Sequence, residues 1–118
     1  MLSIWLIVLI FAIAAVIGLT LAIAAFQGRF PPVSSAVLHG VLAAAALVLL
    51  IIAVVVHAAT GSAMWALGFF VVAALGGFTL ALGFHARRKS LPKGLVAGHA
   101  VLAVIGFLLL LAGALQLI

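Results

Sequence analysis

Four long apolar runs constrain this chain more than any other feature of its sequence. They span residues 3–27, 34–57, 63–86 and 94–117, and a helix needs about 20 mostly apolar residues to cross a bilayer. The runs are too long for barrel strands, and no alternation with a period of two is present. Because 71% of the residues are hydrophobic and only 4% are charged, the chain cannot cover a soluble globule with polar groups. The sequence therefore predicts an integral membrane protein.

Short segments join the four runs, at residues 28–33, 58–62 and 87–93. The first and third of them contain prolines, and a proline just ahead of a helix favours a helix start there. Short connections also make neighbouring helices antiparallel. We therefore expect one all-α transmembrane domain over residues 1–118, folded as an up-down-up-down four-helix bundle.

The five basic residues predict the orientation of this bundle. One lies in the first connection and four lie in the third, whereas the second connection has none; they are Arg29, Arg87, Arg88, Lys89 and Lys93. All of them therefore fall on one side, which the positive-inside rule makes cytoplasmic. We expect both termini outside the inner (cytoplasmic) membrane, and we interpret the cations as topology determinants rather than as lipid-binding or nucleic-acid-binding patches.

An internal repeat relates residues 1–58 to residues 61–118. The alignment pairs Trp5 with Trp65, Gly18 with Gly77 after a one-residue slip, Arg29 with Lys89, Pro32 with Pro92, and His39 with His99. Each half then forms a helical hairpin, and the two hairpins are parallel and related by a pseudo-two-fold axis along the membrane normal. This axis exchanges the second and fourth helices. If they face one another, His39 and His99 approach from opposite sides, roughly 8 Å below the cytoplasmic rim.

The residue types that are missing exclude most chemistry. The chain has no Asp, Glu or Cys, so it offers no carboxylate for acid–base work or for Mg²⁺ or Ca²⁺ binding, and no thiolate. Hydrolysis and group transfer have no residues to carry them, and the chain has no catalytic residues of its own. Four histidines remain.

His39 and His99 point to bis-histidine ligation of one haem b, because two imidazoles on opposite sides give a six-coordinate electron-transfer centre. Small residues beside them, Gly40 and Gly98 in particular, would leave room for a flat macrocycle. The cations at the adjacent rim that could neutralise the haem propionates are Arg29, Arg87, Arg88 and Lys89.

With this histidine pair and four spans, the chain resembles the small four-helix transmembrane b-type cytochromes, the cytochrome b561-like group in particular. The resemblance implies electron transfer through the membrane or to quinone. The chain departs from the two-haem members of that group, because only His57 lies near the other membrane face. The resemblance, with this departure, therefore predicts a single haem in a membrane subunit that needs other subunits as partners.

Several alternatives stay open. Intramembrane histidines can also form interhelical hydrogen bonds that only hold a bundle together, and a chlorin pigment, a quinone or a metal ion could replace haem. The competing function is a cofactor-free accessory subunit of a respiratory or photosynthetic complex. A small multidrug-type transporter would resemble its relatives in using a membrane-embedded Glu, which is missing here. We expect His57 and His85 to be interfacial side chains in contact with water or headgroups.

Overall fold

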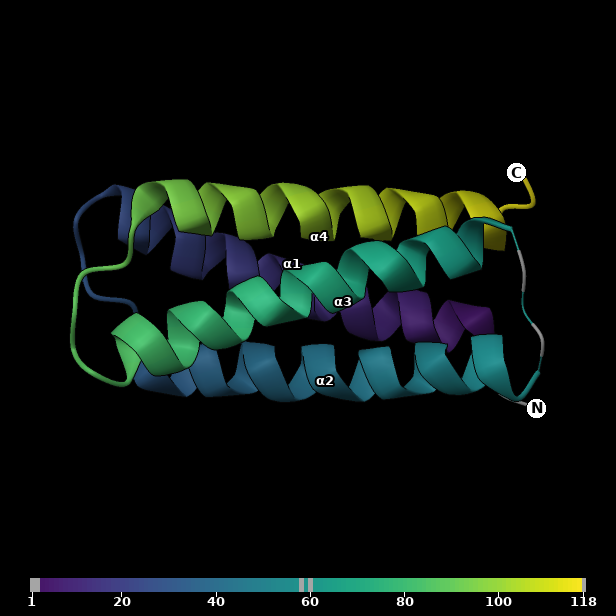
Figure 1. The fold of residues 1–118 in the computed structure, drawn as a ribbon, viewed down its shortest axis with the longest axis horizontal. Coiled ribbons are helices and arrows are strands. Elements are labelled where there is room, and N and C mark those ends of the chain that lie inside the picture. Colours follow the sequence, from purple (N-terminus) through teal and green to yellow (C-terminus); the bar gives the residue numbers. More distant parts are fainter. Residues whose placement is uncertain (1–2, 58, 60, 118) are drawn as a thin grey trace.

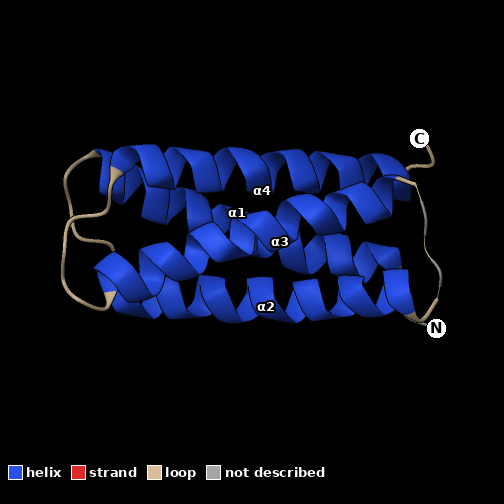
Figure 2. Cartoon of the chain, viewed as in Figure 1, coloured by secondary structure: helices blue, strands red, loops and turns tan. Residues whose placement is uncertain are grey.

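The chain folds into four long helices. A computed structural model describes residues 3–57, 59 and 61–117, and its helices are α1 (Ile4–Phe26), α2 (Val33–Val55), α3 (Ser62–Leu80) and α4 (Lys93–Ala114) (Figures 1 and 2). A π-helical segment, η1 (Ala81–His85), continues α3. The four predicted spans are confirmed, with helix bounds within about three residues of the apolar runs when η1 is counted with α3.

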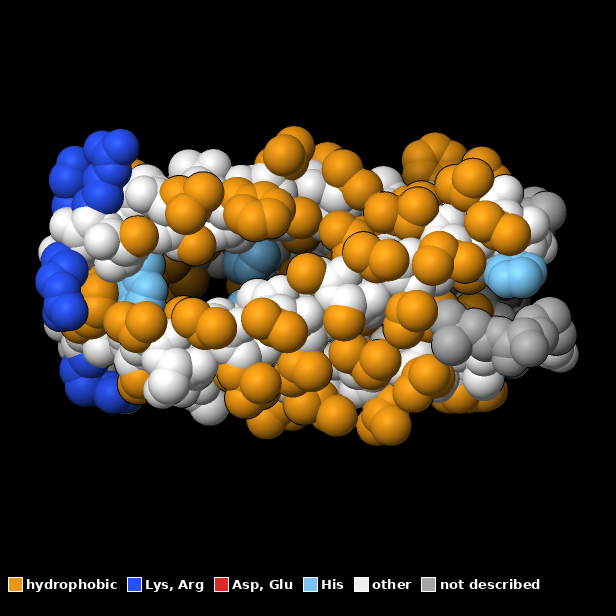
Figure 3. Space-filling model, turned by 90° about the horizontal axis from the view of Figure 1, so that it is seen from below, with side chains coloured by type: hydrophobic (Ala, Val, Ile, Leu, Met, Phe, Trp, Pro, Cys, Tyr) orange, Lys and Arg blue, Asp and Glu red, His pale blue; other side chains and the backbone are white. Residues whose placement is uncertain are grey.

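The dimensions and the surface of the bundle suit a bilayer. Each candidate span has 22 to 24 residues and a mean hydropathy between 2.1 and 3.1, and the Cα atoms extend over 41 Å along the long axis. Large apolar side chains cover the outside; Val16 is 65% exposed and Trp65 is 71% exposed (Figure 3). Such a surface is stable next to lipid and costly in water. The chain is therefore built to pass through a membrane several times.

The helices form an up-down-up-down bundle in which α2 and α4 lie diagonally opposite each other. Helix α1 packs against α2 and α4, and α3 packs against α4 and α2 (Figure 1). The other diagonal, between α1 and α3, is bridged at the core by the buried rings of Phe11 and Phe70, which stack with centroids 3.9 Å apart and planes 3° apart. The expected bundle, with its second and fourth helices facing each other, is confirmed.

The core repeats between the two hairpins. Phe11 and Phe70 occupy equivalent positions, and so do Leu50 and Leu110, both 0% exposed. From Phe11 onward, equivalent residues of α1 and α3 differ by 59 in number, whereas those of α2 and α4 differ by 60. The second hairpin thus holds one extra residue between its helices. The π-helical segment η1, which fits an additional residue into a helical turn, lies within that stretch.

The basic residues gather at one end of the bundle. The α1–α2 connection holds one cation, the segment after η1 holds three, and α4 begins with the fifth. Figure 3 shows this end covered by Lys and Arg. Helix α1 begins and α4 ends at the opposite end (Figure 1).

Candidate functional site

The structure brings together the two histidines that the repeat pairs. His39 extends from α2 and His99 from α4, and both side chains are partly buried. Their ring centroids lie 6.3 Å apart, and the ring planes stand at 83° to each other. Two imidazoles from diagonally opposite helices therefore meet in the interior of the bundle.

Each ring is held by a hydrogen bond inside its own hairpin. The Nδ1 atom of His39 lies 2.7 Å from the carbonyl oxygen of Ala14, and the Nδ1 atom of His99 lies 2.7 Å from that of Ala73. A carbonyl oxygen can only accept, so Nδ1 must carry the proton and donate it in both cases. The Nε2 atom of each neutral ring is then left with a lone pair.

Two glycines allow the histidine rings to lie against the neighbouring helix of the same hairpin, Gly18 on α1 for His39 and Gly77 on α3 for His99. A Cβ atom added at Gly18 would stand 2.7 Å from Cε1 of His39, and one added at Gly77 would stand 3.1 Å from Cε1 of His99. Contacts under 3.0 Å essentially never occur for real Cβ atoms, so any side chain at Gly18 would push the ring away. Both glycines stand in the repeat alignment, and that recurrence was the signal for their role.

The glycines expected to line the site, Gly40 and Gly98, are placed differently. Both lie at exposed positions of their helices, and a Cβ added at either would meet nothing within 4 Å. Gly40 directly follows His39 and Gly98 directly precedes His99. Neighbouring residues on a helix point about 100° apart. Closeness in sequence therefore did not place them against the rings.

Neither Nε2 atom of the histidine pair forms a hydrogen bond among the described residues. Among the described residues no fully buried side-chain nitrogen or oxygen lacks a hydrogen-bond partner, and the bonds formed by the two rings use Nδ1. The Nε2 atoms are therefore not sealed inside the packing. Figure 3 shows a hollow near the basic end that is bordered by histidine side chains. The two Nε2 lone pairs therefore have no protein partner among the described residues.

Aromatic contacts close the interior on either side of the histidine pair. The Phe11–Phe70 stack lies about 10 Å from the level of Gly77, and His85 lies about 12 Å from it on the basic side, by the helical rise. The Nε2 atom of His85 donates to the carbonyl oxygen of Pro31 at 2.8 Å. Its ring also stacks on Phe30, with centroids 4.6 Å apart.

These contacts differ from the interfacial role expected of His85, because the ring is partly buried between two elements. It ties the end of the π-helical segment to the α1–α2 connection. The side chain thus joins the two hairpins at the basic end.

The cations expected near the propionates lie at this end, at exposed positions. The guanidinium carbon of Arg88 is 6.0 Å from the centroid of the Phe30 ring, and Nε of Arg29 donates to the side-chain oxygen of Gln27 at 2.9 Å. Arg87 and Lys89 lie two and four residues after the end of η1 at His85. The positive charge is therefore concentrated next to, and outside, the histidine level.

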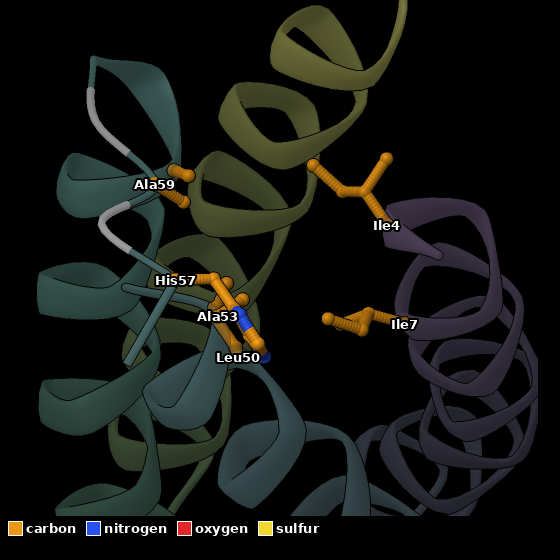
Figure 4. A pocket seen from close by; sticks show the side chains of 7 residues that line it. Ile4, Ile7, Leu50, Ala53, His57 and Ala59 are labelled. Atoms are coloured by element: carbon orange, nitrogen blue, oxygen red, sulfur yellow. The ribbon is translucent and has the colours of Figure 1, made fainter. Parts of the chain in front are cut away.

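His57 lies at the other end of the bundle, 18 residues along the chain from His39 and thus about 27 Å away along the axis. It is exposed at a cavity of about 140 Å³, otherwise lined by apolar residues (Figure 4): Ile4, Ile7, Leu50, Ala53, Ala59 and Ala63. This cavity contains neither ring of the histidine pair. Among the described residues no group of three or more His, Cys, Asp or Glu side chains gathers to hold a metal ion.

No family model, curated protein or solved structure matches the chain. The function proposed below therefore depends on the geometry of the chain itself.

Proposed function

We propose that the chain binds one haem b between His39 and His99 and serves as an electron-transfer subunit of a larger membrane complex. The observation that carries the proposal is the state of the two rings. Each donates from Nδ1 to a backbone carbonyl, which leaves an Nε2 atom that is not fully buried and has no hydrogen-bond partner among the described residues. Histidines that bind a metal are oriented in this way, with the other ring nitrogen donating to a carbonyl or carboxylate.

The spacing of the rings supports the same proposal. A metal ion bound to imidazole lies about 2 Å from the ligating nitrogen. Two ligating nitrogens on opposite sides then stand about 4 Å apart, and the ring centroids, each about 1 Å further back, stand about 6 Å apart. The observed separation is 6.3 Å. The separation of the two centroids is therefore compatible with one iron between the rings.

The chain's own residues would act as follows. His39 and His99 ligate the iron, the carbonyls of Ala14 and Ala73 fix the two rings, and Gly18 and Gly77 leave room for them. Bound in this way, the haem supplies one-electron transfer. The cations at the basic end would neutralise its anionic propionates, in a chain that has no acidic residue to compete for them.

The proposal includes partners and a location. The helices fill almost all of the described chain, and its connections are short, so electrons must come from and go to other subunits or a membrane quinone. The asymmetry of the cations supports the inner (cytoplasmic) membrane, with the basic connections on the cytoplasmic side and the termini outside.

A cofactor-free accessory subunit is the second candidate, and the same hydrogen bonds favour it. They tie α2 to α1 and α4 to α3, which is what histidines in a purely structural role would do. In that role the Nε2 atoms bind nothing, because the hydrogen bonds between the helices use Nδ1. The two candidates differ in whether anything binds between the rings.

The optical spectrum of the purified protein or complex separates them. The reduced-minus-oxidised spectrum should show b-type α and Soret bands, and His39→Ala or His99→Ala should abolish them. His57→Ala is the matched control, since it removes a histidine at the other end and should leave the bands intact. If the spectrum of the parent protein shows no such bands, the haem proposal is wrong and the cofactor-free accessory subunit remains. Bands that survive in both His39→Ala and His99→Ala would mean that the ligands lie elsewhere.

A further inference from the structure

A second cavity lies at the basic end, on the outer side of the first hairpin. It has a volume of about 380 Å³ and lies between the last turns of α1 and the first turns of α2, lined by Thr20, Ile23, Ala24, Arg29, Pro32 and Ser35. Thr20, Ile23 and Pro32 are exposed. The cavity therefore opens toward the surroundings of the bundle, at the level where lipid headgroups meet the hydrocarbon.

The hydrogen-bond donors around this cavity suit an anion. The guanidinium of Arg29 uses Nε and Nη2 to bond the side-chain oxygen of Gln27, which leaves three of its five N–H groups free. The hydroxyl of Thr20 donates to the carbonyl oxygen of Ile17 and can only accept from a ligand. The hydroxyl of Ser35 has no hydrogen-bond partner in the part of the chain that the structure describes.

The adjoining start of α2 adds to this preference. Its cap residue is Pro32, no side chain caps the helix, and its first turn holds no acidic residue. The first N–H groups of a helix have no partner within the helix and carry partial positive charge. The chain itself supplies no carboxylate to meet them.

We propose that this cavity binds the phosphate of an anionic phospholipid, held by the guanidinium of Arg29 and the hydroxyl of Ser35. A ridge of exposed apolar side chains runs from the cavity toward the middle of α1. Ile23 is 44% exposed, Leu19 is 61% exposed and Val16 is 65% exposed. At spacings of three and four residues they share one face of the helix, along which an acyl chain of the same lipid lies.

The second hairpin does not repeat this site. Leu95 stands at the position equivalent to Ser35, so the hydroxyl donor is missing there. The end of the helix that corresponds to α1 is π-helical, and its His85 bonds Pro31. One lipid site per chain is therefore expected, and it breaks the pseudo-two-fold symmetry of the bundle.

Native mass spectrometry tests the proposal without haem. A variant lacking both His39 and His99 is reconstituted in phosphatidylcholine vesicles that contain phosphatidylglycerol, and the phosphatidylglycerol retained per chain is measured after release. Loss of a hydrogen bond to a charged group corresponds to roughly 10–100-fold, so adding Arg29→Gln should lower retention at least about tenfold, and Ser35→Ala should lower it less. Lys93→Gln removes a charge at the same end but outside the cavity, and it should change little.

Two outcomes would overturn the site. One is retention in Arg29→Gln equal to that of its parent, and the other is an equal loss in Lys93→Gln, which would reduce the effect to net charge. The chain that keeps both histidines then serves to distinguish a lipid phosphate from a haem propionate as the group that Arg29 binds. The affinities of Arg29→Gln for haem and for haem dimethyl ester are compared with those of the parent, because loss of a guanidinium that serves a propionate would weaken binding of haem and not of the ester. If the substitution weakens haem binding alone and leaves lipid retention intact, Arg29 serves a propionate and the lipid site is refuted. Because the lipid measurement uses no haem, its failure is distinct from failure of the proposed function.

Discussion

Replacing Gly18 by alanine should loosen haem binding without unfolding the bundle. The new Cβ atom would stand 2.7 Å from Cε1 of His39, and ordinary contact begins at 3.4 Å, so the ring must move by about 0.7 Å. That movement disturbs a hydrogen bond of 2.7 Å to Ala14. Disturbing the groups that orient a metal ligand typically costs 10–100-fold in affinity, or about 1.4–2.7 kcal/mol. Overpacking costs about 1–3 kcal/mol of folding stability, and alanine returns about 0.5–1 kcal/mol through its better helix propensity.

The assay is a titration of haem-free protein with haem, followed by Soret absorbance, beside thermal unfolding in the same detergent. Gly40→Ala is the matched control, because its Cβ would meet nothing within 4 Å, and it should bind haem as the parent does. Gly77→Ala should fall between the two, since its Cβ would stand 3.1 Å from Cε1 of His99 and needs a shift of only about 0.3 Å. Equal affinity of the Gly18 and Gly40 variants would refute the placement of haem between these rings.

Three further predictions concern the frame around the site. Phe11→Ala and Phe70→Ala should each cost about 3–5 kcal/mol of stability, and the double variant should cost about 0.5–1.5 kcal/mol less than their sum because the rings stack; strictly additive unfolding free energies would contradict the stack. His85→Ala should lower the unfolding free energy by about 0.5–1.5 kcal/mol through loss of its bond to the α1–α2 connection, and an unchanged unfolding midpoint would show that this contact is idle. The chain has no native cysteine, so single cysteines at Ser90 and Leu117 can report orientation: an impermeant maleimide should label the first from the cytoplasmic side and the second from outside, and the reverse pattern would invert the proposed topology.

The sequence predicted the large features of the fold because membrane insertion leaves few alternatives. An apolar run must become a helix, and its length is set by the bilayer. The predicted spans therefore differ little from the helices observed in the structure. The repeat added the diagonal placement of α2 and α4, and hence the meeting of His39 with His99. Both predictions depended on patterns that extend over the whole chain.

The contacts that hold the rings could not be predicted in the same way. The carbonyls of Ala14 and Ala73 accept the hydrogen bonds, and every residue offers a carbonyl, so residue type carries no signal. Gly18 and Gly77 were visible as a repeated match, but their role depends on how α1 and α3 rotate against the histidine helices. The π-helical turn at Ala81–His85 was missed because the apolar run continues through it.

The hydrogen bonds of His39 and His99 have a consequence for how the protein is assembled. Each bond closes within one hairpin, from α2 to α1 or from α4 to α3, so each pair of helices can complete its own polar contacts as it leaves the insertion machinery. Between the hairpins, apart from the bond of His85 to Pro31, the described helices meet chiefly through apolar side chains, which pack almost as well against lipid. A haem ligated from both halves would then add a stronger link between them than the single hydrogen bond of His85. In that case the supply of haem, rather than synthesis of the chain, would set how much mature protein accumulates.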